Sequence, residues 1–333
     1  MAWGLIGAST IAAEQLIKAT RNVVREQLIF VNRSTQSGAE ACATTHGIPQ
    51  ASTDLALLPS DPLERAVYVS STNDRHLAQM LQAIAAAKRV LCDMPLALTR
   101  SDAIQMVQAA QAKGVILVTN QRQRCAGSRR AVHDLFAAGR IGRVLSLRLH
   151  HADPLPPHLQ GWRIADPAGR EGISEFNVHD DEVARFLLAE DPVLVVAQSG
   201  TSGMGQGVVV SVMAVWTMLS GAMVMAHESF AHTFGGTGFK GYGTDGSIVA
   251  HGVMTQCPVG EVELVTAAER KAEPDDTTGL QEHALHRFAA AVDGKGLPAA
   301  TGWDRVRSLA VAVAVAEAAA TVQRTDINFG VAP

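Results

Sequence analysis

The chain has 333 residues, 47% of them hydrophobic and 18% charged, which suits a soluble enzyme with two domains and a large core. Its formal net charge of −4 argues against a large basic face for nucleic acid, and no apolar run is long enough to span a bilayer. Its four cysteines lie far apart and its histidines form no ligand-spaced cluster, so we expect neither a disulfide framework nor a metal site.

The first third of the chain alternates short β-branched runs with helical stretches. Such alternation with short turns is typical of a parallel sheet covered on both faces, so we predict an α/β fold. The predicted strands are residues 3–6, 28–31, 66–69, 89–92 and 115–118, and the predicted helices are residues 11–25, 39–45, 75–87 and 102–112.

The pattern changes near residue 143, where strand-like runs begin to follow one another with few helices between them. This pattern predicts a second domain built on a mostly antiparallel sheet. The predicted strands are residues 144–150, 193–198, 208–216, 223–230 and 246–250, and the predicted helices are residues 173–189, 278–292 and 304–323.

The first predicted strand leads directly into a turn of the dinucleotide-binding kind. The full G-x-G-x-x-G pattern is absent, and the chain reads Gly7-x-Ser9-x-x-Ala12 instead. Gly7 permits the tight turn, and a small Ser9 lets the backbone approach a pyrophosphate at a helix N-terminus. Glycine-rich turns also occur without a ligand. The turn residues that we predict to bind the cofactor are Gly7, Ala8, Ser9, Thr10 and Ile11.

The ends of the second and third strands carry further candidate cofactor ligands. After the second strand comes Arg33-Ser34 with no carboxylate for a ribose hydroxyl, which favours NADP(H) over NAD(H), although a solvated turn is the alternative. After the third strand, small polar groups can line the cofactor channel or can cap the following helix. The candidates there are Ser71, Thr72, Asn73 and His76.

The fourth strand ends at Asp93-Met94-Pro95, where a ligand crevice is expected. We assign Asp93 and Pro95 to the cofactor and Met94 to the substrate, although a thioether cannot carry a proton. Asn120, after the fifth strand, is a further candidate substrate contact. The arginines that follow it favour anionic groups or mark a solvated helix start; they are Arg122, Arg124, Arg129 and Arg130.

The predicted helix at residues 173–189 carries a candidate acid–base pair. Glu175 and His179 are spaced i, i+4 and share one helix face, so the carboxylate can orient the imidazole and raise its pKa. The alternative is a surface salt bridge. Before this helix, Trp162-Arg163 offers stacking and a forked donor as a substrate clamp, with a surface cation–π contact as the alternative.

The order of these motifs resembles that of the Gfo/Idh/MocA oxidoreductases. The resemblance rests on residues 4–12, 70–73, 92–96 and 172–179. It implies a Rossmann NADP-binding domain at residues 1–121 and a C-terminal α/β domain with a large open antiparallel sheet at residues 122–333. It also implies that the cofactor is NADP(H) and that a sugar-like carbonyl or alcohol is the substrate. From the order of the elements, we expect the last helix to pack toward the first domain.

The resemblance also implies a lysine, an acid and a histidine around the reacting carbon. By position, the lysine becomes Met94, the acid becomes Glu175 and the histidine stays as His179. The glutamate before that lysine becomes Asp93, and an arginine in the 2′-phosphate loop falls on Gly38. Losing a charged donor beside a developing alkoxide costs on the order of 3 kcal/mol, or about a hundredfold in rate.

Three functions fit these residues. The first is an NADP(H)-dependent oxidoreductase of a small sugar-like carbonyl or alcohol, with His179 and Glu175 as the acid–base pair. The second keeps the cofactor but performs a transient-redox elimination or isomerisation, or acts on a less sugar-like substrate. The third is a catalytically silent cofactor-binding sensor. We expect a cytoplasmic monomer or homodimer with no nucleic-acid, membrane or metal partner.

Overall fold

The chain is divided into two units, each assembled from two separate stretches. The computed structural model describes residues 2–9, 12–22, 27–60, 64–157, 160, 170–204, 207–255, 259–274 and 279–330. The first unit comprises residues 1–125 and 279–306, and the second comprises residues 126–278 and 307–333. This division differs from the expected one at residues 121/122, because the chain returns to the first unit near its C-terminal end.

Six parallel strands form the sheet of the first unit within the described residues, in the order β3-β2-β1-β4-β5-β6. The strand order reverses beside β1, so the carboxyl ends of β1 and β4 border the crevice where doubly wound sheets bind ligands. All five predicted strands are present, and β3 is an addition. The strands are β1 (Ala2–Ile6), β2 (Gln27–Asn32), β3 (Gln50–Ser52), β4 (Glu64–Val69), β5 (Arg89–Cys92) and β6 (Leu117–Thr119).

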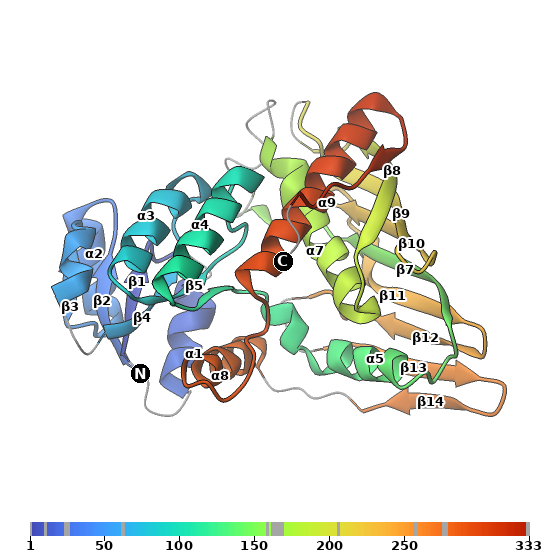
Figure 1. The fold of residues 1–333 in the computed structure, drawn as a ribbon, viewed down its shortest axis with the longest axis horizontal. Coiled ribbons are helices and arrows are strands. Elements are labelled where there is room, and N and C mark those ends of the chain that lie inside the picture. Colours follow the sequence, from blue (N-terminus) through green and yellow to red (C-terminus); the bar gives the residue numbers. More distant parts are fainter. Residues whose placement is uncertain are drawn as a thin grey trace. The chain divides into compact units, whose positions relative to one another are not determined.

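Helices connect these strands, as the alternating pattern predicts. A π-helical turn (Ala12–Leu16) continues into α1 (Ile17–Asn22), followed by α2 (Gln36–His46), α3 (Asn73–Ala85) and α4 (Arg100–Lys113). Gly114 ends α4 in the left-handed conformation, as its position predicts. The returning helix α8 (Leu280–Val292) lies beside α1 (Figure 1), and its Phe288 packs against Trp3 with ring centroids 5.0 Å apart.

The second unit is built on a mixed sheet of nine strands among the described residues, in the order β14-β13-β12-β11-β7-β10-β9-β8-β15. The pairing of β7 with β10 is parallel and the other pairings are antiparallel. The strands are β7 (Val144–Ala152), β8 (Pro192–Gly200), β9 (Ser211–Met218), β10 (Met223–Ser229), β11 (Gly236–Gly243), β12 (Gly246–His251), β13 (Glu261–Thr266), β14 (Arg270–Glu273) and β15 (Thr325–Asp326).

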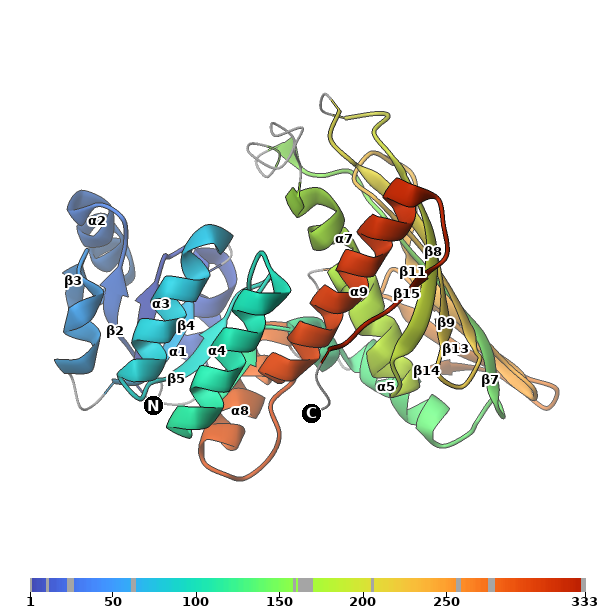
Figure 2. The same ribbon diagram turned by 45° about the horizontal axis from the view of Figure 1, so that its top comes forward.

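Three helices cover one face of this sheet: α5 (Gly127–Ala137), α7 (Arg170–Leu188) and the second part of α9 (Gly302–Thr321) (Figures 1 and 2). Alternation along β9 explains the two faces, because Trp216 is buried against the helices whereas Met213 and Val215 are exposed. The last helix was expected to pack toward the first domain. Its start, up to Val306, belongs to the first unit, whereas Val311 and Val315 belong to the core of the second unit; α8 belongs to the first unit.

None of the helices within the described stretches of the chain is long and apolar enough to cross a membrane. The alanine-rich segment of α9 is instead buried in the core of the second unit.

The contact between α8 and β1 gives a stability prediction. Phe288→Ala removes a fully buried ring from its contact with Trp3, so we expect it to lower the free energy of unfolding by about 3–5 kcal/mol. Chemical denaturation followed by tryptophan fluorescence measures this. Phe234→Ala is the matched control, because Phe234 is 99% exposed and its loss should change stability by less than about 0.5 kcal/mol. Equal effects of the two variants would contradict the assignment.

Candidate functional site

The turn after β1 is pressed against the backbone after β4. Gly7 has a φ of +103° and donates its N–H to the carbonyl of Asn32 at 2.9 Å. A Cβ on Gly7 would lie 2.4 Å from the Ser71 nitrogen, so a larger residue does not fit there. Ala8 continues the turn with a φ of +53°. Gly7 therefore allows the loops after β1 and β4 to approach each other closely.

Ser9 links this turn to the helix that follows and to the loop after β4. Its N–H donates to the Ser70 hydroxyl at 3.1 Å, and its own hydroxyl accepts the Ala12 N–H at 3.2 Å. Ser9 therefore caps the helix start and holds the turn in place. The predicted cofactor residues Thr10 and Ile11 lie outside the described residues.

The loop after β2 exposes a cation at the start of α2. Thr35 caps α2 by accepting the Gly38 N–H at 3.2 Å, and the Arg33 side chain runs beside Gly38, where a Cβ would lie 3.8 Å from Nε. Burial raises the pKa of the nearby Cys42 thiol, and the Arg33 charge offsets part of that rise. Within the described residues the Arg33 guanidinium has no hydrogen bond or ion pair, and Ser34 beside it is exposed.

In the loop after β4, the Thr72 hydroxyl is exposed to solvent and the Ser71 hydroxyl is hydrogen-bonded. Thr72 occupies the N-cap position of α3 but, within the described residues, makes no side-chain hydrogen bond to the helix, so its exposed hydroxyl is available. Ser71 instead donates to Gln79 on α3. Asn73 is the first residue of α3 and is half-buried. Thr72 therefore occupies the predicted N-cap position, but its side chain does not cap the helix.

His76 is fully buried and joins this loop to the one after β5. Its Nδ1 lies 2.9 Å from the Pro95 carbonyl oxygen, and its Nε2 lies 3.1 Å from the Ser71 carbonyl oxygen. Pro95 follows a cis peptide bond with Met94, which is half-buried. The imidazole thus fixes the distance between two strand-end loops whose residues are predicted to bind cofactor and substrate.

A buried network of polar side chains contacts the loop after β5 through Asp93. The Asn120 amide donates to the Tyr68 hydroxyl at 3.0 Å and to Gln281 at 3.2 Å, and Tyr68 in turn hydrogen-bonds Asp93. Desolvation raises the pKa of Asp93, while the Arg122 charge and these hydrogen bonds offset part of that rise. Asn120 is 4% exposed, so its observed role is to hold the Asp93–Pro95 loop.

The arginine cluster predicted beside the crevice is largely internal. Arg122, Arg124 and Arg129 are each at most 9% exposed, so a solvated helix start does not describe them. Arg124 donates to the Ala299 carbonyl at 3.2 Å and pairs with Asp304 at 3.3 Å. Arg129, on α5, donates to the Val253 carbonyl at 3.4 Å. These cations connect segments that are far apart in the sequence.

In the second unit, His179 lies on α7 and is half-buried. Glu175 lies on the same helix, as predicted, but its side chain is outside the described residues, as are Trp162 and Arg163. The ring of His151, from β7, meets the His179 ring edge-on, with centroids 6.1 Å apart and an interplanar angle of 78°. The structure therefore adds a second imidazole beside the predicted acid–base residue.

Beside these imidazoles lies a buried carboxyl pair that the sequence did not reveal. The Asp180 N–H donates to Glu228 Oε1 at 3.2 Å, and both side chains are at most 2% exposed. Burial raises the pKa of Asp180 to about 7 and that of Glu228 well above its usual value. The alternation of β10 carried a usable signal, because Glu228 falls on the same face as the buried Val224 and Ala226.

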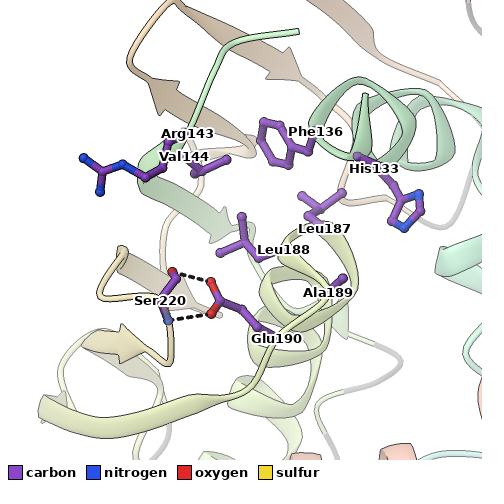
Figure 3. A pocket seen from close by; sticks show the side chains of 10 residues that line it. His133, Phe136, Arg143, Val144, Leu187, Leu188, Ala189, Glu190 and Ser220 are labelled. Atoms are coloured by element: carbon purple, nitrogen blue, oxygen red, sulfur yellow. Dashed lines mark hydrogen bonds between the residues drawn. The ribbon is translucent and has the colours of Figure 1, made fainter. Parts of the chain in front are cut away.

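A pocket of about 220 Å³ opens at the far end of α7 (Figure 3). Two of its polar residues bind each other, since Glu190 accepts both the Ser220 N–H and the Ser220 hydroxyl at 2.7 Å. Leu187, where α7 meets the pocket, is eight residues beyond His179, or about 12 Å along the helix. None of the predicted site residues whose side chains the structure describes lines this pocket. No group of three or more histidine, cysteine or acidic side chains in the described stretches is arranged to hold a metal ion.

Comparisons with known proteins identify relatives of both parts of the chain. Residues 1–121 match the model "Oxidoreductase family, NAD-binding Rossmann fold", and residues 129–249 match the "GFO/IDH/MocA C-terminal domain". Along 330 residues the chain is 47% identical to the 1,5-anhydro-D-fructose reductase of Ensifer adhaerens, covering 98% of this chain and 99% of that protein.

Solved structures share the fold at lower identity. The aldose-aldose oxidoreductase of Caulobacter crescentus, complexed with glycerol, aligns with a TM-score of 0.89 at 18% identity, covering 98% of this chain and 99% of that one. A levoglucosan dehydrogenase in complex with NADH and levoglucosan aligns with a TM-score of 0.84 at 19% identity, with the same coverage.

The turn after β1 gives a binding prediction. In Gly7→Ala the new Cβ meets the Ser71 backbone, so we expect the affinity for a nicotinamide dinucleotide to fall at least about tenfold, measured by fluorescence titration. Gly47→Ala is the control, because Gly47 also has a positive φ, +55°, but nothing lies within 4 Å of the added Cβ. Unchanged affinity in Gly7→Ala would show that this turn does not bind the dinucleotide.

Proposed function

Because the chain belongs to the Gfo/Idh/MocA oxidoreductase family, we propose that it is an NADP(H)-dependent oxidoreductase of a sugar-like or other small carbonyl or alcohol substrate. The observation that carries the proposal is the pairing of a dinucleotide-type turn at Gly7 with a half-buried imidazole at His179. Both occur in a chain related along its whole length to a sugar reductase.

The residues of the first unit fit a nicotinamide dinucleotide. The Gly7 turn has no room for a Cβ, the helix after Ser9 begins at that turn, and the Thr72 hydroxyl is exposed. Backbone N–H groups at a helix start suit a pyrophosphate. We assign the turn at residues 7–11 to the pyrophosphate and the loops at residues 71–73 and 93–95 to the remainder of the dinucleotide. When bound, the cofactor supplies or accepts the hydride.

Arg33 supports NADP(H) over NAD(H). Its side chain is exposed at the carboxyl end of β2 and lies alongside Gly38, at the start of α2. A planar cation with several N–H donors binds a phosphate more strongly than it binds a ribose hydroxyl. The proposal therefore places the 2′-phosphate on Arg33, with Ser34 as an additional donor.

The proton chemistry is assigned to α7. In the reduction direction the carbonyl carbon gains a hydride and its oxygen gains the proton of the His179 imidazolium, which leaves a neutral ring and an alcohol. In the oxidation direction the neutral ring accepts the hydroxyl proton. Glu175, one helical turn before His179, is assigned as the partner that orients the imidazole. Trp162, Arg163 and Met94 are assigned to the substrate, whereas the buried Asn120 is assigned to support of the Asp93–Pro95 loop.

Met94 supports a second candidate function. It is half-buried at the position where the family resemblance places a lysine, and a thioether neither donates a hydrogen bond nor carries a proton. A site of this kind suits a less polar substrate, or a transient oxidation followed by elimination or isomerisation, in which the hydride returns without net cofactor turnover.

The surroundings of the protein follow from the same proposal. The described cysteines Cys42 and Cys92 are free and buried, which suits a reducing cytoplasm. A small-molecule substrate, with no nucleic-acid or membrane partner, suits the net charge of −4. The apolar side chains on the outer face of the second sheet, among them Met213 and Met225, are compatible with a homodimer as well as with a monomer.

Nicotinamide absorbance tests the main proposal. Purified protein, NADPH or NADP, and a panel of sugar-like ketones and alcohols should show turnover. His179→Ala should lower it at least about a hundredfold, because the proton donor is lost. His251→Ala is the control, since His251 is an exposed histidine of the same unit. Equal rates for wild type and His179→Ala would remove His179 from the mechanism.

Met94→Lys separates the two candidate functions. If the natural protein reduces sugar-like carbonyls, the added ammonium should raise its rate, by up to about a hundredfold. Turnover by Met94→Lys alone, with an inactive wild type, would instead favour the elimination or isomerisation reaction. Wild-type binding of NADPH without turnover of any substrate by either protein would favour a sensor.

Cofactor choice is tested by Arg33→Ser. We expect its NADPH affinity to fall roughly tenfold to a hundredfold while NADH affinity is unchanged, because only the 2′-phosphate contact is lost. Arg65→Ser is the control, since Arg65 is exposed at the opposite, amino end of the sheet on β4. A parallel loss for both cofactors would contradict the assignment of the phosphate to Arg33.

A further inference from the structure

The strand pairing of the second unit brings Glu228 and His151 together under α7. β10 and β7 run parallel, and Glu228 is the register partner of His151. Both strands contact α7, which lies across this face of the sheet (Figure 1). Residues of adjacent strands that share a register position are about 5 Å apart, so the two side chains approach the helix at the same point.

Asp180 on α7 completes a carboxyl pair with Glu228. Asp180 is fully buried, and within the described residues neither of its side-chain oxygens accepts an N–H hydrogen bond. A carboxylate in that position is costly unless a proton is shared with its neighbour. A retained proton would let one of the two carboxyl groups donate a hydrogen bond to the other. Both pKa values are raised by burial, in agreement with a retained proton.

His151 lies between this pair and His179. Its Nδ1 is 3.9 Å from Asp180 Oδ1, and its ring meets the His179 ring edge-on at 6.1 Å. Burial, with the charges of Arg129 and His150, lowers the pKa of His151 to about 4, so its ring is neutral at physiological pH. A neutral imidazole beside His179 does not repel the His179 ring when that ring is protonated.

Other charged groups also face the pair. Arg129 from α5 interacts with Asp180 and Glu182, and Asp181 of α7 interacts with both members of the pair. His150, next to His151 on β7, adds a further titratable ring. The negative charge of Asp181 and the burial of the pair favour retention of a proton by the pair near neutral pH.

We propose that the Asp180–Glu228 carboxyl pair and His151 form a positioning unit that holds the His179 ring and sets its charge state. The inference rests on the proposed acid–base role of His179. His179 alternates between imidazolium and neutral imidazole in each turnover. A negative charge on the pair stabilises the imidazolium, and loss of that charge on protonation weakens it. The three residues act through His179 and are not assigned any contact with substrate.

Ring-labelled histidine NMR tests this without requiring turnover. In full-length wild-type protein, titrated from about pH 5 to about pH 9, the His179 signal should shift in two steps, its own and that of the pair. In Glu228→Gln, which keeps an acceptor for the Asp180 N–H, only Asp180 of the pair can still ionise, so the pair carries less negative charge and we expect a lower His179 midpoint. Asp180→Asn should behave in the same way, and His179→Ala assigns the signal.

Asp134→Asn is the matched control, because Asp134 is an exposed aspartate that pairs with a different histidine, His133, at 3.0 Å. It should leave the His179 titration unchanged. In His151→Gln we expect kcat to fall roughly tenfold with KM retained, since the ring is less well oriented while substrate contacts remain. This loss is smaller than that expected for His179→Ala.

The outcomes separate this inference from the proposed function. A His179 titration identical in wild type, Glu228→Gln and Asp180→Asn would overturn the inference even if the protein is an active oxidoreductase. A two-step titration in wild type, with a lower His179 midpoint in both variants, supports it, even if no carbonyl substrate is turned over. If one variant does not fold, the other variant and the wild-type titration test the inference. A pair with a purely structural role predicts a single step in the wild-type His179 titration.

Discussion

The contact between the Gly7 turn and the Ser70–Ser71 backbone is the constraint on which the first unit depends. Because β1 and β4 are neighbours where the strand order reverses, the loops that follow them must pass within van der Waals distance. The absence of a Cβ at Gly7 permits this. His76 then extends the same constraint from Ser71 to Pro95, so loops after three strands are held as one set.

The two units stabilise buried polar groups in different ways. In the first unit, Tyr68, Asn120 and Gln281 are neutral and satisfy one another through directed hydrogen bonds, and one carboxyl group, Asp93, ends the chain of bonds. In the second unit, Asp180 and Glu228 are both acidic, so burial changes their protonation. A neutral network resists changes in pH, whereas the acidic pair responds to them.

Predictions from the sequence succeed where a local pattern decides the structure. The β-branched runs give the five strands of the first sheet, and Gly114 ends its helix as expected. The pattern gave no sign of β11, whose sequence GTGFKGYG is rich in glycine, because pairing with β7 and β12 defines that strand. Local pattern likewise could not show that Arg129 is buried or that Glu228 meets Asp180, since both depend on contacts across the fold.

The division of the chain into interleaved stretches has a consequence for how such proteins diversify. Residues 279–306 return to the first unit after the second has begun, and α9 starts in one unit and continues in the other. A single crossover therefore cannot exchange the second unit for that of a relative, since it would separate Phe288 from Trp3 or divide α9. Substitution within a unit is a more direct route to change in this architecture than exchange of a whole unit.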